Sequence, residues 1–145
     1  MASVEVTETD PVSAWNALKS NPDAQLVDVR TRAEWSFVGA PDLGQIGKQT
    51  ILLEWRSYPN MAANEGFVET LLSGLDPSVR EIYFICRSGA RSLDAARAVA
   101  AGLAQTARDG ICVNVAEGFE GDLNEAGHRG TVGGWKMRGL AWRQS

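Results

Sequence analysis

The chain has 145 residues, of which 44% are hydrophobic and 22% are charged, and its formal net charge is −4. This composition is typical of a globular protein with a hydrophobic core, and we expect residues 1–145 to form a single domain. Nucleic-acid binding is not expected, because that affinity comes mainly from basic side chains that neutralise phosphates. One histidine and two cysteines are too few for a convincing zinc site, so no metal or other cofactor is predicted.

Membrane association is not expected either. The sequence lacks an apolar run of the length, about 18 residues or more, that a membrane-spanning helix needs. The segment 1–5 has neither the basic nor the apolar region of a signal peptide. We therefore expect a cytoplasmic location.

Strands and helices are predicted to alternate along the chain. Helices are indicated where a capping residue precedes apolar residues three and four positions apart, as at Asp10 and at Thr31 with Glu34. Strands are indicated by short apolar runs between turn residues. In chain order we expect a helix from Pro11 to about residue 20, a strand over 25–30, a helix over 32–38, a loop over 39–47, a strand over 50–55, a helix over 67–75, a strand over 82–85, a helix over 93–107 and a strand over 111–115.

This alternation predicts parallel strand pairing and an α/β fold with an open sheet. The strand over 50–55 is short and apolar, which is typical of an internal strand. Ligands of such sheets bind beyond the carboxyl ends of the strands. Asp28, Arg30, the loop that opens at Cys86 and the segment 117–119 are all expected at that edge.

The loop after the strand 82–85 carries the strongest functional signal. It opens with Cys86 and precedes a helix, so the thiol is expected among backbone N–H groups at the positive end of a helix dipole. Arg87 and Arg91 add positive charge. All three influences favour the thiolate, which is the reactive form. We predict that Cys86 is a nucleophile; the alternative is an inert cysteine at a strand end.

The rest of this loop is predicted to bind the substrate. Arg91 is expected to point into the loop and hold an anion, whereas Arg87 is equally consistent with a solvated side chain. Ser92 is more typical of a helix N-cap than of a donor to the sulfur. The predicted substrate-binding residues are Arg87, Ser88, Gly89, Ala90, Arg91 and Ser92.

Asp28 and Arg30 have two interpretations. They either support the Cys86 loop from a neighbouring strand or form an ion pair at the end of their own strand. A disulfide between Cys86 and Cys112 is not expected, because they would lie at opposite ends of adjacent parallel strands, roughly 15 Å apart. Cys112 is expected to pack in the core.

The carboxyl-terminal segment 128–145 is basic and has no acidic residue. Its only histidine, His128, has no neighbour in the sequence that would orient it as a catalytic base. The pattern indicates a solvated basic face or a docking surface for an anionic partner. The basic residues are Arg129, Lys136, Arg138 and Arg143.

The length of the cysteine loop separates two kinds of chemistry. Cysteine phosphatases have one residue more between cysteine and arginine, which makes a loop wide enough for a tetrahedral phosphate. Here four residues separate Cys86 from Arg91, and the tighter loop suits a single sulfur atom carried on the cysteine. Sulfur chemistry is therefore favoured over phosphorus chemistry.

The chain resembles single-domain rhodaneses over nearly its whole length. The resemblance implies a five-stranded parallel sheet between two layers of helices. It also implies transfer of a sulfane sulfur through a persulfide on Cys86, with Arg91 holding an anion. The implied partners are small sulfur-containing anions such as thiosulfate, and a thiol or sulfur-carrier protein as acceptor. The matching segments are 26–30, 34–35, 83–92, 117–119, 134–135 and 139–142.

Two features depart from the rhodanese pattern. Many rhodaneses have Gly-His-Ile where this chain reads Gly-Ala-Pro at 39–41, so a histidine is missing. The segment 122–133 is an apparent glycine-rich insertion, placed where it could cover the active site and alter the choice of donor or acceptor. Two other functions stay open: a non-catalytic binding or redox-sensing module, and a phosphatase or arsenate reductase that uses the same thiolate.

Overall fold

A computed structural model describes residues 5–106 and 108–144. Residues 1–4, on which the absence of a signal peptide was argued, and Ala107, the last residue of a predicted helix, lie outside the described residues. The elements are β1 (Val6–Thr9), α1 (Pro11–Ser20), β2 (Ala24–Asp28), α2 (Arg32–Phe37), β3 (Ala40–Pro41), the 3-10 helix η1 (Gly44–Ile46), β4 (Ile51–Leu52), β5 (Arg56–Ser57), β6 (Ala62–Ala63), α3 (Phe67–Gly74), β7 (Glu81–Ile85), α4 (Ala90–Gln105), β8 (Ile111–Val115) and β9 (Trp142–Arg143).

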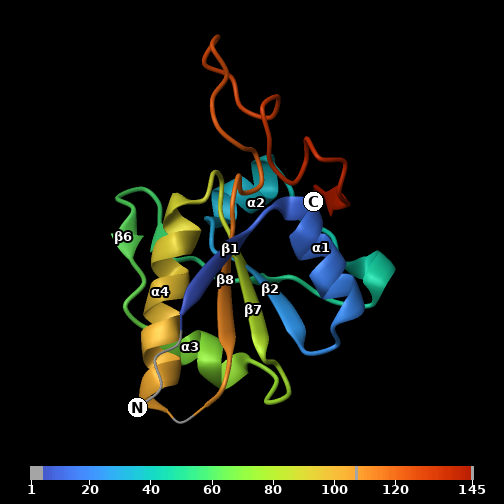
Figure 1. Cartoon of the computed structure of the whole chain (residues 1–145). Helices are drawn as coiled ribbons and strands as arrows, with labels where there is room; N and C mark the ends of the chain where they lie inside the picture. Colours follow the sequence, from blue (N-terminus) through green and yellow to red (C-terminus); the bar gives the residue numbers. More distant parts are fainter. Residues whose placement is uncertain (1–4, 107, 145) are drawn as a thin grey trace.

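A five-stranded parallel sheet with the order β1-β8-β7-β2-β4 forms the centre of the molecule, as Figure 1 shows. This confirms the predicted α/β fold, with two corrections. The chain pattern did not indicate β1, whose residues are only partly covered and which forms by pairing with β8. The strand expected over 50–55 is paired in this sheet only at Ile51–Leu52, and it lies at the edge of the sheet rather than inside it.

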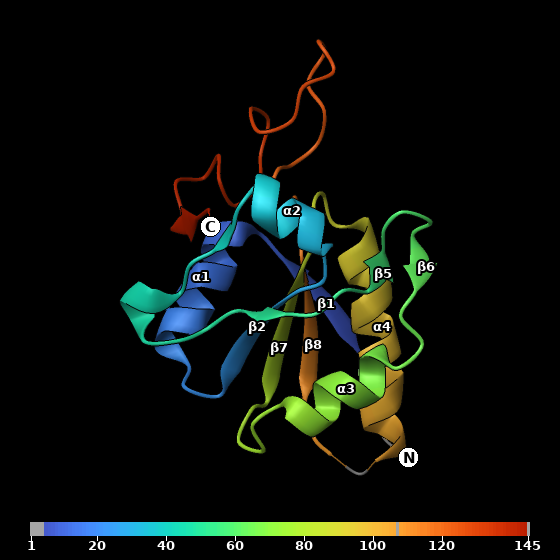
Figure 2. The same cartoon turned by 180° about the vertical axis from the view of Figure 1, so that it is seen from behind.

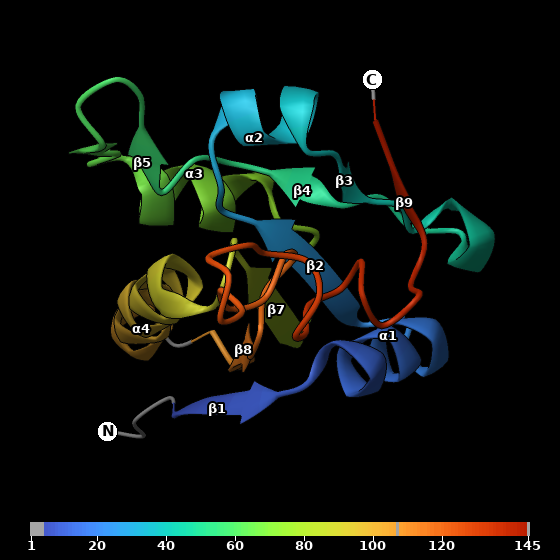
Figure 3. The same ribbon diagram turned by 90° about the horizontal axis from the view of Figure 1, so that it is seen from above.

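Helices cover both faces of the sheet. Figure 3 shows α3 and α4 on one face and α1 on the other. Successive residues of a strand point to opposite faces. Accordingly Val27 and Phe84 pack in the core beneath α3 and α4, while Leu26 and Ile85 pack in the core that includes α1. Trp135, which is fully buried, completes this second core from the carboxyl-terminal segment.

The helix starts follow from their capping residues. Asp10 accepts a hydrogen bond from the Ser13 backbone N–H at 2.8 Å and starts α1, and Thr31 with Glu34 forms the predicted capping box of α2. The start of α4 differs from the prediction. Its N-cap is Gly89, with φ of 114°, so Ser92 lies inside the first turn of the helix and is not the cap. A left-handed residue turns the chain into the helix earlier than expected, and glycine adopts that conformation at low cost.

The segment 122–133 projects beyond the carboxyl edge of the sheet, as Figures 1 and 2 show. The two ends of this segment lie close together: a Cβ atom on Gly121 would collide with the backbone of Gly133. The segment 39–47, expected to be loop, contains β3 and η1, and β3 pairs with β9 near the end of the chain. In the described part of the chain, no helix is both long and apolar enough to span a membrane.

Candidate active site

Cys86 directly follows β7, and its side chain is 1% exposed. Two donors meet its sulfur atom. The backbone N–H of Gly89 lies 3.1 Å from Sγ, and the hydroxyl oxygen of Ser92 lies 3.2 Å from it. Both donors belong to the start of α4, whose dipole favours negative charge at this end. One backbone N–H and one hydroxyl thus meet the sulfur, whereas the sequence analysis expected several backbone N–H groups around it.

Ser92 connects the sulfur to a buried amide that the sequence analysis missed. The Ser92 Oγ lies 2.6 Å from Oδ1 of Asn114, and Nδ2 of Asn114 donates to a carboxylate oxygen of Glu8 and to the carbonyl of Gly89. These two acceptors fix the orientation of the amide. The Ser92 hydroxyl has one proton and three acceptors within reach: Oδ1 of Asn114, the sulfur of Cys86, and the carbonyl of Gly89 at 3.2 Å. A polar residue inside the apolar strand 111–115 was the sequence signal for this position.

Arg91 forms an ion pair with Glu34 of α2, and this pairing was not predicted. Two nitrogen atoms of its guanidinium meet the two carboxylate oxygens at 2.8 and 2.9 Å. Burial opposes the charged form of Glu34, but the hydrogen bonds and charge of Arg91 outweigh it and hold the pKa of Glu34 below its ordinary value. Burial likewise opposes the charge of Arg91, and Glu34 outweighs it and raises the pKa of Arg91. Arg91 is thus a fixed cation beside the loop, with its terminal nitrogens already partnered.

A pocket of about 310 Å³ lies against the cysteine loop. Tyr58 and Met61, which line it, come from the turn between β5 and β6, and no spacing in the sequence linked that turn to Cys86. No residue of 122–133 lines the pocket, so the insertion does not form its wall. The lining residues are Tyr58, Met61, Cys86, Arg87, Ser88, Ala90 and Arg91.

The turn at 117–119 holds the backbone of the cysteine loop. The N–H of Phe119 donates to the carbonyl of Cys86 at 2.8 Å, and the N–H of Glu120 donates to the carbonyl of Arg87 at 3.0 Å. Gly118 lies so close that a Cβ atom there would be 2.5 Å from the Cys86 carbonyl oxygen. This close approach explains why a glycine occupies the position.

Asp28 and Arg30 form a fully buried ion pair at 2.6 Å, the second of the two interpretations given above. Arg30 also donates to the carbonyl of Gly39 and lies over the ring of Phe119, 4.2 Å from its centroid. Because Phe119 is hydrogen-bonded to Cys86 through its backbone, the ion pair is also linked indirectly to the cysteine loop, so the two interpretations do not exclude each other. Neither residue lines the pocket at Cys86.

Comparisons with known proteins place the chain in a family. It is 36% identical over 131 residues to an uncharacterized protein of Rickettsia conorii, covering 90% of this chain and 91% of that one. It is also similar to Rv0390 from M. tuberculosis, a solved structure with 39% identity and a TM-score of 0.82 that covers 99% of this chain and 100% of that one. The chain belongs to the family of these proteins. No model of an established protein family matches it.

More distant structures identify the fold. A rhodanese-like domain protein from Staphylococcus aureus has 20% identity and a TM-score of 0.53, covering 77% of this chain and 86% of that one. The polysulfide-sulfur transferase homodimer from Wolinella succinogenes has 22% identity and a TM-score of 0.56, covering 97% of this chain and 80% of that one. This chain therefore has the rhodanese-like fold.

The other reactive side chains of this rhodanese-like chain lie away from the cysteine loop. Cys112 is unpaired and buried in the core, and burial raises the pKa of its thiol to about 12. It pairs in register with Ile82 near the start of β7, whereas Cys86 follows the end of β7, so the expectation that they form no disulfide is confirmed. His128 is exposed on the insertion. Among the described residues, no group of acidic, histidine and cysteine side chains is placed to hold a metal ion.

Proposed function

We propose that this protein is a sulfurtransferase that carries a sulfane sulfur as a persulfide on Cys86. The observation that carries the proposal is the pair of donors, the Gly89 N–H and the Ser92 hydroxyl, that meet Sγ at the start of α4. The Gly89 N–H is a fixed donor, which stabilises negative charge without reorganisation during the reaction, and the Ser92 hydroxyl can turn its proton from Asn114 to the sulfur. The same arrangement suits a thiolate before transfer and a persulfide anion after it.

In the first half-reaction, the Cys86 thiolate attacks the outer sulfur of thiosulfate. A bond forms between Sγ and that sulfur, the sulfur–sulfur bond of thiosulfate breaks, and its electron pair leaves with sulfite. A persulfide donor reacts in the same way and releases a thiolate. This is covalent catalysis, in which the enzyme holds the transferred group between two steps.

In the second half-reaction, a nucleophile attacks the terminal sulfur of the persulfide. Cyanide takes the sulfur as thiocyanate, and the electron pair of the broken sulfur–sulfur bond returns to Cys86 as thiolate. In the cell, we propose a small thiol or a sulfur-carrier protein as acceptor. We also propose a cytoplasmic location, where free thiols are kept reduced.

Charged residues around the pocket give it a preference for anions. Arg87 is exposed at the pocket and can meet an incoming sulfur anion. Arg91 contributes a permanent positive charge, although its terminal nitrogens are engaged by Glu34. We assign Arg87 to the capture of the anion and Arg91 to the electrostatic field around the sulfur. Ser88 and Ala90 line the wall between them.

Intact mass after brief incubation with thiosulfate tests the proposal. The wild-type protein should gain one sulfur atom, and cyanide should remove it. The Cys86→Ser variant should gain none, while Cys112→Ala, which removes the buried thiol instead, should behave as wild type. If neither thiosulfate nor a small persulfide modifies the protein, sulfur transfer is refuted. Turnover of an aryl phosphate would then favour a phosphatase, and inactivity would favour a binding or sensing module.

A further inference from the structure

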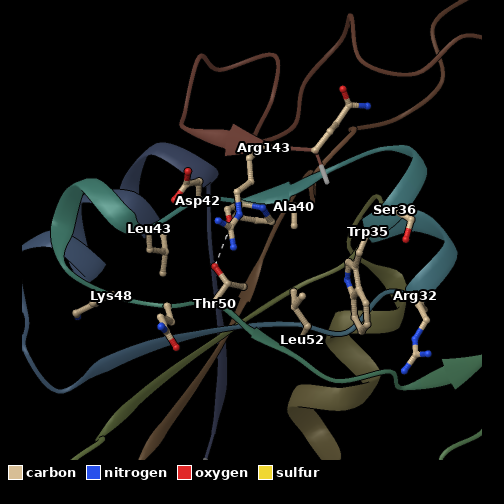
Figure 4. Close-up of a pocket in the computed structure, with 13 residues that line it drawn as sticks. Arg32, Trp35, Ser36, Ala40, Asp42, Leu43, Lys48, Thr50, Leu52 and Arg143 are labelled. Carbon is tan, nitrogen blue, oxygen red and sulfur yellow. Dashed lines mark hydrogen bonds between the residues drawn. The ribbon is translucent and has the colours of Figure 1, made fainter.

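A second, larger pocket lies on the other side of α2 from the cysteine loop. Its volume is about 770 Å³, within the range of small-molecule sites. Helix α2 separates the two sites, because Glu34 pairs with Arg91 while Trp35 lines the larger pocket. Neither Cys86 nor any other residue of its loop lines this pocket. Figure 4 shows its walls, which come from α2, the segment 40–43, the segment 48–52 and β9.

One wall of this pocket is apolar. Leu52, on the edge strand β4, is 46% exposed and faces the pocket beside Trp35, as Figure 4 shows. Leu43 and Pro41 continue the apolar surface. The indole nitrogen of Trp35 is buried, so Trp35 contributes to this wall through its ring and not as a hydrogen-bond donor.

The charged residues of the pocket are mainly basic, although the chain as a whole carries a net charge of −4. Lys48 is already engaged, since its Nζ donates to the carbonyls of Asn21 and Ala24. Arg32 and Arg143 are exposed, and neither side chain hydrogen-bonds to another described residue. The only carboxylate in the lining is Asp42, which accepts a hydrogen bond from the backbone of Gly44.

Among the basic residues of the carboxyl-terminal segment, Arg143 is the one whose side chain has no hydrogen-bond or ion-pair partner among the described residues. Arg138 pairs with Glu117, Lys136 donates to a backbone carbonyl, and so does Arg129. The guanidinium of Arg143 instead reaches into the large pocket toward Thr50, as Figure 4 shows. The sequence analysis left two interpretations of the basic segment 128–145, a solvated face or a docking surface for an anionic partner. In the structure, Arg143 is the basic residue of this segment that remains a candidate for binding an anion.

The position of Arg143 is fixed by the packing of β9. Ala40 pairs with Arg143, and Pro41 pairs with Trp142, in the β3–β9 ladder. The ring of Trp142 lies under the ammonium group of Lys136, 3.9 Å from its centroid, and packs so closely on Gly39 that a Cβ atom there would be 2.7 Å away. The backbone of Arg143 is therefore held beside the pocket, while its exposed side chain has no hydrogen-bond partner among the described residues and is available to a ligand.

We propose that this pocket binds a small organic anion. The anionic group, a carboxylate, sulfonate or phosphate, would pair with Arg143, whose planar guanidinium can donate two parallel hydrogen bonds. The apolar body of the ligand would lie on Leu52 and Trp35. This site is separate from Cys86, so the proposal holds whether or not the protein transfers sulfur.

Fluorescence titration with anilinonaphthalene sulfonate, an aromatic body with one sulfonate, tests the proposal. We expect saturable binding at one site. Arg143→Ala should weaken it by about tenfold or more, as expected for the loss of a charge-assisted contact. Leu52→Glu should also weaken it, because it places a negative charge on an already exposed position of the apolar wall.

The matched control is Arg97→Ala, which removes an exposed arginine on α4 and should leave the affinity unchanged. In amide NMR spectra, the largest shifts should fall at Thr50, Leu52 and Arg143. Shifts centred on Cys86 and Arg87, equal weakening by both arginine variants, or no saturable binding would each overturn the proposal. None of these readouts depends on persulfide formation, so failure here and failure of sulfur transfer are distinguishable.

Discussion

The contact of Gly118 with the cysteine loop gives a prediction that can be worked out from distances. Gly118 has φ of 65°, and a Cβ atom there would lie 2.5 Å from the Cys86 carbonyl oxygen and 2.6 Å from the Arg87 carbonyl carbon. Both contacts are with backbone, which cannot rotate away as a side chain could. Gly118→Ala must therefore push the cysteine loop and the turn at 117–119 apart.

Two contributions set the magnitude. A residue other than glycine in the left-handed region costs roughly 1 kcal/mol. Separation of the two segments also weakens the hydrogen bonds from Phe119 and Glu120 to the loop carbonyls, each worth about 1 kcal/mol. We expect Gly118→Ala to lower the free energy of unfolding by about 3 kcal/mol and to slow persulfide formation at Cys86.

Gly47→Ala is the matched control. Gly47 has a similar φ of 69°, but a Cβ atom there would meet nothing within 4 Å, so only the conformational cost of about 1 kcal/mol applies. With a urea dependence of about 2 kcal/mol per M, the midpoints of the two variants should differ by about 1 M. Equal midpoints, or an unchanged rate of persulfide formation in Gly118→Ala, would refute the idea that this contact positions the cysteine loop.

Three further predictions concern the pocket and its surroundings. Glu34→Gln removes the partner of Arg91 and should lower the free energy of unfolding by about 2 kcal/mol at pH 7, whereas Glu69→Gln on the exposed side of α3 should have little effect. The pKa of Glu34 in the folded protein lies below its ordinary value of 4.5. The loss of stability in Glu34→Gln should therefore be present above pH 4.5 and should disappear as the pH falls through the folded pKa. A loss of stability that persists below the folded pKa would contradict the ion pair. Burial raises the pKa of Cys112 to about 12, and Cys86, unlike Cys112, lines a pocket. Iodoacetamide at about pH 9 should therefore label the folded protein once, at Cys86, and should not label folded Cys86→Ser. Equal labelling of both thiols, read by mass, would contradict this difference between them. Tyr58→Ala should speed alkylation of Cys86 by the bulky reagent N-ethylmaleimide severalfold relative to iodoacetamide, and Leu123→Ala, at a similarly exposed apolar position, should not; an unchanged ratio would show that Tyr58 does not restrict access.

The sequence determined those features that depend on neighbours along the chain. The N-cap at Asp10 and the capping box at Thr31 and Glu34 were predicted from spacing alone, and both form. The strand, cysteine loop and helix around Cys86 were also predicted, because a buried apolar run followed by a glycine turn and a helical pattern leaves few other conformations. These signals are local, so no knowledge of the rest of the fold was needed.

The tertiary structure decided which distant residues surround the sulfur. Asn114 and Tyr58 reach the cysteine loop from β8 and from the β5–β6 turn, and Arg91 meets Glu34 across 57 positions of the chain. The edge strand β1 has too few apolar residues to be recognised without its partner β8. Such contacts depend on how strands pair and how helices pack, and the periodicity of a single segment contains no information about its partner. The sequence thus located the cysteine loop, and packing determined the walls and charges around it.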